Sequence, residues 1–146
     1  METITGIKLE RFWLTDLKRV ADLIYYDGPI VSHFKNQPGD DYLYCWSDSD
    51  EHYNRWLIFR VSRQALNDYL TQQLTLRDLM LNPADRFLYC VDIDNEFQYH
   101  HPYLVFPNQL PAIYLPETDA YYDFEPIVFE IIPAQPLPQL YMPLAA

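Results

Sequence analysis

The sequence predicts an α+β fold: a small, mostly antiparallel sheet with two short helices between strands, plus a proline-rich, extended C-terminal arm. Three observations lead to this prediction. Two aromatic and β-branched runs, residues 42–46 and 56–61, flank a polar stretch, which is the pattern of a β-hairpin with a long loop. Two short helix signals follow this hairpin. Nine prolines then interrupt the chain after residue 99.

Both faces of the predicted hairpin are apolar. Leu43 and Cys45 alternate with Tyr42, Tyr44 and Trp46 along the first strand. A sheet that is solvated on one side normally alternates apolar and polar residues. We therefore expect the aromatic face to be covered, either by another part of the chain or by a partner.

The segments before the hairpin are less sharply defined. Residues 4–14 show no consistent period, and either a strand or a short packed arm fits them. Residues 15–24 fit either a helix capped by Thr15 or a strand. Asp27-Gly28 predicts a turn, and residues 30–34 then form the return strand.

Two short helices are expected after the hairpin. Ser62 can cap a helix that begins at Arg63. Thr75 and Asp78 resemble a capping box, with Asp in place of the usual Glu, at the start of a second helix. Helices this short are not stable alone, so both must pack on the sheet. Residues 87–93 return to a strand.

The prolines define the expected domain organisation. Proline donates no ladder hydrogen bond, so the segments after residue 99 cannot be long central strands. Large apolar side chains nevertheless persist between the prolines, which is not typical of a disordered tail. We predict an α+β core domain over residues 1–100 and a proline-rich acidic arm over residues 101–146, packed on the core or on a partner.

Charge and composition restrict the possible partners. The 146-residue chain carries a net charge of −11, and all ten basic residues lie at or before Arg86. This field repels nucleic acid and anionic lipid and attracts basic proteins. No apolar run approaches the ~20 residues of a membrane span, and the N-terminus does not resemble a secretory signal. Cys45 and Cys90 fall in predicted strands and are expected as buried thiols, so we predict a cytoplasmic protein.

Residues 17–94 carry four distinctive segments, Tyr25-Tyr26-Asp27-Gly28-Pro29, Tyr42-Leu43-Tyr44 with Trp46, Asn54-Arg55-Trp56-Leu57, and Leu70 with Leu74-Thr75-Leu76-Arg77-Asp78. Together these segments resemble a family of small bacterial proteins of unassigned function. The resemblance implies a compact bacterial cytoplasmic α+β domain. It implies no chemistry and no catalytic residue, and the proline-rich arm lies outside it.

No pattern in the sequence predicts a cofactor or a metal. The loop Asp48–His52 gathers carboxylates and an imidazole, which suit hard-cation binding, acid–base catalysis or simply a solvated turn. Asp92–Glu96 begins like a calcium loop, but Phe97 occupies the position that requires glycine. His100 and His101 are adjacent on a strand, so their rings are expected on opposite faces. Glycine-rich phosphate or dinucleotide loops are absent.

The aromatic face of the hairpin is the predicted binding surface. Tyr44, Trp46, Trp56 and Arg60 combine aromatic rings with an arginine, a composition typical of interfaces. We expect a non-enzymatic interaction module, an acidic accessory or immunity-like subunit that binds a basic protein partner in a bacterial system. A defence or toxin–immunity context fits this function. The alternative is a small enzyme whose site lies in the Asp48–His52 loop and the His100/His101 segment.

Overall fold

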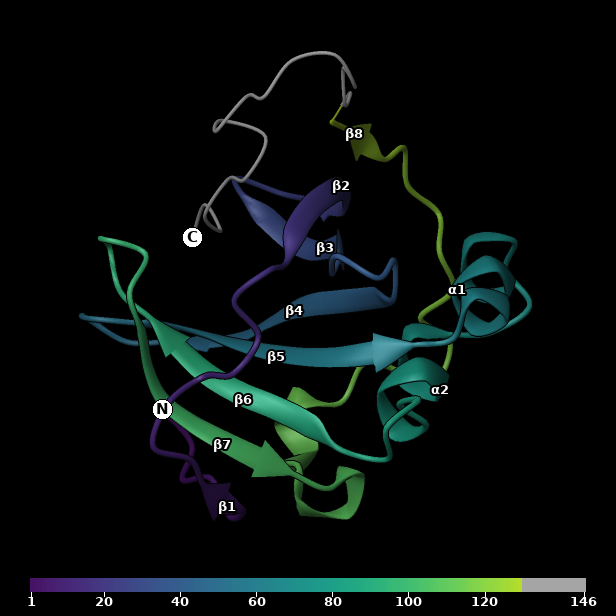
Figure 1. The fold of residues 1–146 in the computed structure, drawn as a ribbon. Coiled ribbons are helices and arrows are strands. Elements are labelled where there is room, and N and C mark those ends of the chain that lie inside the picture. Colours follow the sequence, from purple (N-terminus) through teal and green to yellow (C-terminus); the bar gives the residue numbers. More distant parts are fainter. Residues whose placement is uncertain (130–146) are drawn as a thin grey trace.

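The computed structural model describes residues 1–129, which form one eight-stranded antiparallel sheet and two α-helices (Figure 1). The strand order is β1-β7-β6-β5-β4-β3-β2-β8. The strands are β1 (Ile7–Lys8), β2 (Lys18–Tyr25), β3 (Pro29–Lys35), β4 (Asp41–Ser49), β5 (Asn54–Val61), β6 (Leu88–Ile93), β7 (Tyr99–Val105) and β8 (Ile127–Val128). The helices are α1 (Arg63–Leu70) and α2 (Leu76–Leu81), and two 3₁₀ turns follow β7, η1 (Pro107–Gln109) and η2 (Ala112–Tyr114). The predicted α+β class, with a mostly antiparallel sheet, is confirmed.

The predicted hairpin is β4 and β5, at the centre of the sheet. The two strands pair in antiparallel register, with Trp46 opposite Trp56. The connecting loop is shorter than predicted, because the strands extend to Ser49 and from Asn54. The Asp50 carboxylate closes this turn by accepting the backbone N–H groups of residues 52 and 53, at 2.8 and 2.9 Å.

The two open alternatives near the N-terminus are resolved by pairing. Residues 18–25 form a strand, because β2 lies between β3 and β8 and pairs with both. The helix considered for residues 15–24 does not form. Residues 4–14 form no regular element apart from the two residues of β1, which pair with β7, and the Leu9 N–H donates to the Pro102 carbonyl at 2.8 Å.

Both predicted helix starts are confirmed by their caps. The Ser62 hydroxyl accepts the backbone N–H of Ala65 at 3.0 Å. At the second helix, the Thr75 hydroxyl accepts the N–H of Asp78, and the Asp78 carboxylate accepts the N–H of Thr75, both at 3.0 Å. Asp therefore completes this capping box as Glu usually does.

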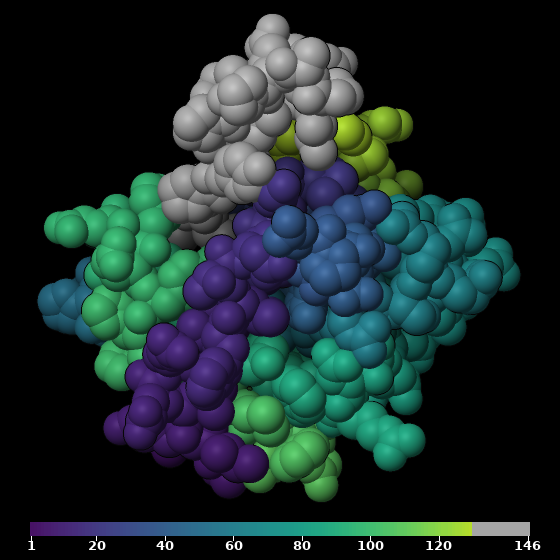
Figure 2. Space-filling model, in the orientation of Figure 1, coloured from purple at the N-terminus to yellow at the C-terminus, as the bar shows by residue number. Residues whose placement is uncertain are grey.

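The sheet is covered on both faces. One face packs against α1, α2 and the chain after β7, with a core that includes Leu43, Cys45, Leu57, Phe59, Leu66, Tyr69, Leu79 and Tyr122. The other face is the aromatic one, and it includes Phe34, Tyr42, Tyr44, Trp56, Ile58 and Val91. Phe12, Leu14 and Leu17 pack on it. Figure 2 shows this N-terminal segment, in purple, lying across the sheet. The cover expected for the aromatic face thus comes, at least in part, from the chain itself.

The described part of the predicted arm belongs to the same core. The expected domain boundary at residue 100 falls inside β7, and Tyr114 and Tyr122 are buried against the sheet. Residues 130–146 of the predicted arm lie outside the described residues. The two cysteines are free and buried, as predicted. Among the helices of residues 1–129, none has the length and apolar character that crossing a membrane requires.

Candidate functional site

The four predicted partner-binding residues do not form one exposed surface. Trp56 and Tyr44 are 0% and 1% exposed, so they have no free surface to offer a partner in this fold. The physical reason is the N-terminal segment, whose apolar side chains pack on the aromatic face. Trp46 remains 39% exposed at the end of β4. Arg60 is half-buried in an ion pair with Asp85, at 2.7 Å.

Trp56 packs against the ring of Tyr44. Its indole lies edge-on to Tyr44, with centroids 6.4 Å apart and an interplanar angle of 61°. The indole N–H has no hydrogen-bond acceptor among the described residues. Its full burial among apolar side chains makes Trp56 a core residue of the sheet.

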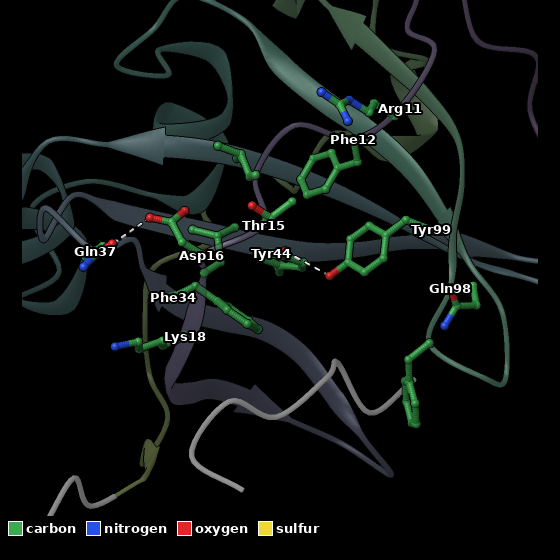
Figure 3. A pocket seen from close by; sticks show the side chains of 13 residues that line it. Arg11, Phe12, Thr15, Asp16, Lys18, Phe34, Gln37, Tyr44, Gln98 and Tyr99 are labelled. Atoms are coloured by element: carbon green, nitrogen blue, oxygen red, sulfur yellow. Dashed lines mark hydrogen bonds between the residues drawn. The ribbon is translucent and has the colours of Figure 1, made fainter. Parts of the chain in front are cut away.

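A cleft of about 780 Å³ lies where the N-terminal segment crosses the aromatic face (Figure 3). Phe12 stacks on Tyr99 with centroids 5.1 Å apart and an interplanar angle of 14°. The hydroxyl groups of Tyr44 and Tyr99 are hydrogen-bonded at 3.1 Å. Burial raises the pKa of Tyr44 well above its usual value, so this phenol stays protonated. The Asp16 carboxylate at the rim accepts the backbone N–H of Gln37 at 2.9 Å. The cleft therefore has aromatic walls and a polar rim.

The polar loop and the histidine segment do meet in space. The ring of Tyr53 lies 5.2 Å from those of both His100 and His101 and 6.2 Å from that of His52. The rings of His100 and His101 are themselves 5.9 Å apart. This corrects the expectation that they point to opposite faces. The cause is the left-handed backbone of His101, with φ 51°, which interrupts the alternation of the strand.

Each histidine of the pair contacts a carboxylate. His101 Nδ1 lies 3.0 Å from Oδ2 of the buried Asp92, and His100 Nε2 lies 2.7 Å from Oδ2 of Asp94. Hydrogen bonds from the N–H of Gln98 and from His100 hold the pKa of Asp94 below its usual value. Within residues 1–129, no group of three or more His, Cys, Asp or Glu side chains is arranged to hold a metal ion.

Asp92 also anchors a buried polar network around Arg55. The guanidinium of Arg55 donates to both oxygens of Asp92, at 2.8 and 3.2 Å, and to the Tyr114 hydroxyl at 3.0 Å. That hydroxyl donates to Asp48 at 2.6 Å. Burial, and then the hydrogen bond to Asp48, raise the pKa of Tyr114 to about 12. The network joins β4, β5, β6 and η2, so its role is structural.

The chemistry of the histidine cluster is therefore limited. An imidazole oriented by a buried carboxylate, as His101 is by Asp92, is half of a general-base arrangement. Three clefts on residues 1–129, including the one beside Phe12, have no imidazole in their walls. No Ser or Cys side chain is hydrogen-bonded to these histidines among the described residues. The cluster thus has the orienting pair, but none of these three clefts on residues 1–129 reaches it.

A different surface gathers the acidic and aromatic side chains, and we call residues 117–125 the acidic ribbon. The ribbon contains four carboxylates and no Lys or Arg, and all four acids are exposed. Tyr121 and Phe124, which alternate with the acids, are each 51% exposed. Tyr121 also lines a shallow hollow with Gln72, Asp119 and Asp123.

Buried contacts hold the ribbon in place. The hydroxyl of Tyr122 donates to the backbone carbonyl of Leu23 at 2.9 Å, and its ring lies 5.3 Å from that of Tyr69. The Gln72 side chain donates to the carbonyl of Tyr122 at 2.7 Å. The N–H of Leu76 donates to the carbonyl of residue 120 at 2.9 Å. The ribbon is thus a fixed surface of the fold.

The family model described as "Family of unknown function (DUF6575)" matches residues 9–132. The chain belongs to this family. The family resemblance inferred from the sequence is confirmed, and the match extends beyond residues 17–94 into the proline-rich arm, which the motifs alone placed outside it. The comparison with curated proteins found no match, and neither did the comparison with solved structures.

In this DUF6575 chain, sequence reasoning missed the ribbon as a site. The signal was present in the alternation of acids with Tyr121 and Phe124. It was not decisive, because only the packing of Tyr122 shows which side chains of the arm point outward.

Proposed function

We propose that the protein is a non-enzymatic interaction module, an acidic accessory or immunity-like subunit that binds a basic protein partner in a bacterial system. The observation that carries this proposal is the acidic ribbon, a fixed surface with exposed carboxylates and exposed aromatic rings and no cation. Carboxylates accelerate encounter with a basic surface, and aromatic rings supply most of the affinity after contact.

The charge distribution supports the same partner. The chain carries −11 overall, and eight acids but no Lys or Arg follow residue 86. A fixed acidic surface costs less to dock than a flexible one, because its backbone is already held by the underlying core. Trp46 and Arg60, two of the residues expected at the interface, lie on the sheet rather than on the ribbon, so we assign the primary contact to Tyr121 and Phe124.

The experiment begins with the immobilised protein and an extract of the cells that produce it. Retained proteins are identified, purified and tested for association kinetics at rising salt concentration. We expect a basic partner whose association slows as salt rises, because the screening length falls to about 8 Å at physiological ionic strength. A partner with an acidic surface, or association that does not depend on salt, would contradict the proposal.

A matched pair of variants locates the contact. One variant neutralises three ribbon acids and the other neutralises three exposed acids elsewhere, so each changes the net charge by the same amount. We expect a roughly tenfold slower association for the first and a much smaller change for the second. Equal effects would show that only net charge matters. The two sets are Glu117→Gln, Asp123→Asn and Glu125→Gln, and Glu10→Gln, Glu51→Gln and Glu96→Gln.

The orienting pair Asp92–His101 is the one observation that favours the alternative, a small enzyme. A His101→Ala variant tests it. If a small molecule raises the melting temperature of the wild type but not of this variant, and no protein partner is recovered, the enzyme alternative replaces the interaction module.

A further inference from the structure

A third cleft, of about 320 Å³, lies at the turn between β2 and β3. Tyr26 of the turn, Pro29 at the start of β3 and Trp46 of β4 line it, together with Asn54 and the buried Trp56 of β5. Three of the four segments on which the family resemblance rests therefore meet at this cleft. The proposed function uses none of them.

The walls of this cleft are held in position. Trp46 lies directly opposite Trp56 in the strand register, and its indole N–H donates to the Asn54 side chain at 3.0 Å. The turn is closed by a hydrogen bond from the N–H of Tyr26 to the carbonyl of Gly28 at 2.9 Å. Gly28 has φ 144°, a conformation that side chains rarely adopt, so glycine is required here by the backbone. The cleft is therefore preformed before a ligand binds.

The charge of the cleft is negative. Asp27 is its one charged lining residue, and its carboxylate has no ion-pair partner among residues 1–129. Tyr26 is 79% exposed and Trp46 is 39% exposed, so both rings are accessible to a ligand. Aromatic faces attract cations, and a planar guanidinium also stacks on them. The chain already makes this contact at another site, where the Arg11 guanidinium lies 5.1 Å from the ring centroid of Trp13.

We propose that the cleft at the β2–β3 turn receives an arginine side chain of the basic protein partner, with the guanidinium between Tyr26 and Trp46 and paired with Asp27. This inference rests on the proposed function for the class of partner, but it concerns a surface separate from the acidic ribbon. An apolar side chain in the cleft would leave the Asp27 carboxylate without an ion-pair partner. A lysine ammonium would pair with Asp27 but cannot stack on the rings as a planar guanidinium does.

The test uses the full chain and a short probe, the peptide acetyl-Ala-Arg-Ala-amide. The control peptide carries citrulline, which has the shape of arginine without its charge. The indole N–H resonances of Trp46 and Trp56 report on the cleft, and that of Trp13, outside it, is the internal control. We expect the arginine peptide to shift the first two with a dissociation constant on the order of 10 mM, since two aromatic contacts and one exposed ion pair supply only that much. Absent shifts, or equal shifts with citrulline, overturn the proposal.

Two variants remove parts of the cleft without touching the core. Asp27→Asn keeps a residue that tolerates the left-handed backbone at this position, where φ is 55°. Tyr26→Ala removes an exposed ring. Each should weaken arginine-peptide binding about two- to fivefold, and Tyr25→Ala, an exposed neighbour that does not line the cleft, should not. Unchanged affinity in both cleft variants would overturn the assignment.

The two proposals fail in different ways. If the purified partner depends on the ribbon acids but the arginine peptide leaves Trp46 and Trp56 unshifted, the cleft assignment is overturned and the interaction module stands. If the peptide binds as expected but no basic partner is recovered, the cleft assignment is supported and the proposed function fails.

Discussion

Replacing Arg55 by Met tests whether the buried polar network holds the N-terminal segment, the hairpin and the chain after β7 together. Its side chain is 10% exposed and that of its partner Asp92 is 3% exposed. Beside this ion pair, Arg55 donates to the Tyr114 hydroxyl at 3.0 Å and to the backbone carbonyl of Glu2 at 2.6 Å. Met keeps much of the apolar stem but removes all of these donors at once.

The expected loss is large because the pair is buried. Removing one partner of a buried ion pair leaves an uncompensated charge and costs about 3–5 kcal/mol. That is a large share of a typical folding free energy of about 5–15 kcal/mol. For a chain of this length, the melting temperature should fall by roughly 10 °C or more. The control is Arg60→Met on the same strand. Its pair with Asp85 is one-third exposed, so we expect a loss of about 1 kcal/mol or less.

The assay is urea unfolding at pH 7, followed by tryptophan fluorescence, on Arg55→Met, Asp92→Asn and the double variant. If the two residues stabilise the fold as a pair, the double variant loses less than the sum of the single losses, by about 1–3 kcal/mol. The reasoning is refuted if Arg55→Met costs no more than Arg60→Met, or if the single losses add within about 0.5 kcal/mol.

Three further predictions concern other contacts. Burial lowers the pKa of His33 despite its 2.7 Å contact with Asp41, so the unfolded chain binds more protons below pH 6.5. The free energy of unfolding should therefore fall as pH drops below 6.5, and His33→Gln should flatten that part of the curve; an unchanged slope contradicts this. Thr75→Ala removes the capping hydroxyl that accepts the N–H of Asp78, and it should lower the free energy of unfolding in urea by about 1 kcal/mol. An unchanged free energy would show that the cap does not stabilise the fold. Tyr122→Phe removes the buried hydrogen bond to the Leu23 carbonyl and should cost about 1–3 kcal/mol, with faster amide exchange across the ribbon; unaltered exchange would show that this hydroxyl does not hold the ribbon in place.

Local signals in the sequence predicted the elements that depend on neighbouring residues. Ser62 and Thr75 mark helix starts because a cap binds N–H groups three residues away. The alternation around Leu43 and Tyr44 predicted both faces of the hairpin, because successive side chains of a strand point to opposite sides. For the same reason, the sequence alone showed that the aromatic face needs a cover.

Only the tertiary structure decided what that cover is and which rings remain exposed. Trp56 and Trp46 look alike in sequence, yet one is buried and the other half exposed, because the cover depends on remote segments. The same holds for residues 18–25, where two neighbouring strands select a strand over a helix. Arg55 and Asp92 are 37 positions apart, and no local pattern relates them. Burial and pairing across such separations depend on the whole fold, so the candidate surfaces of this protein emerge only when the chain is folded.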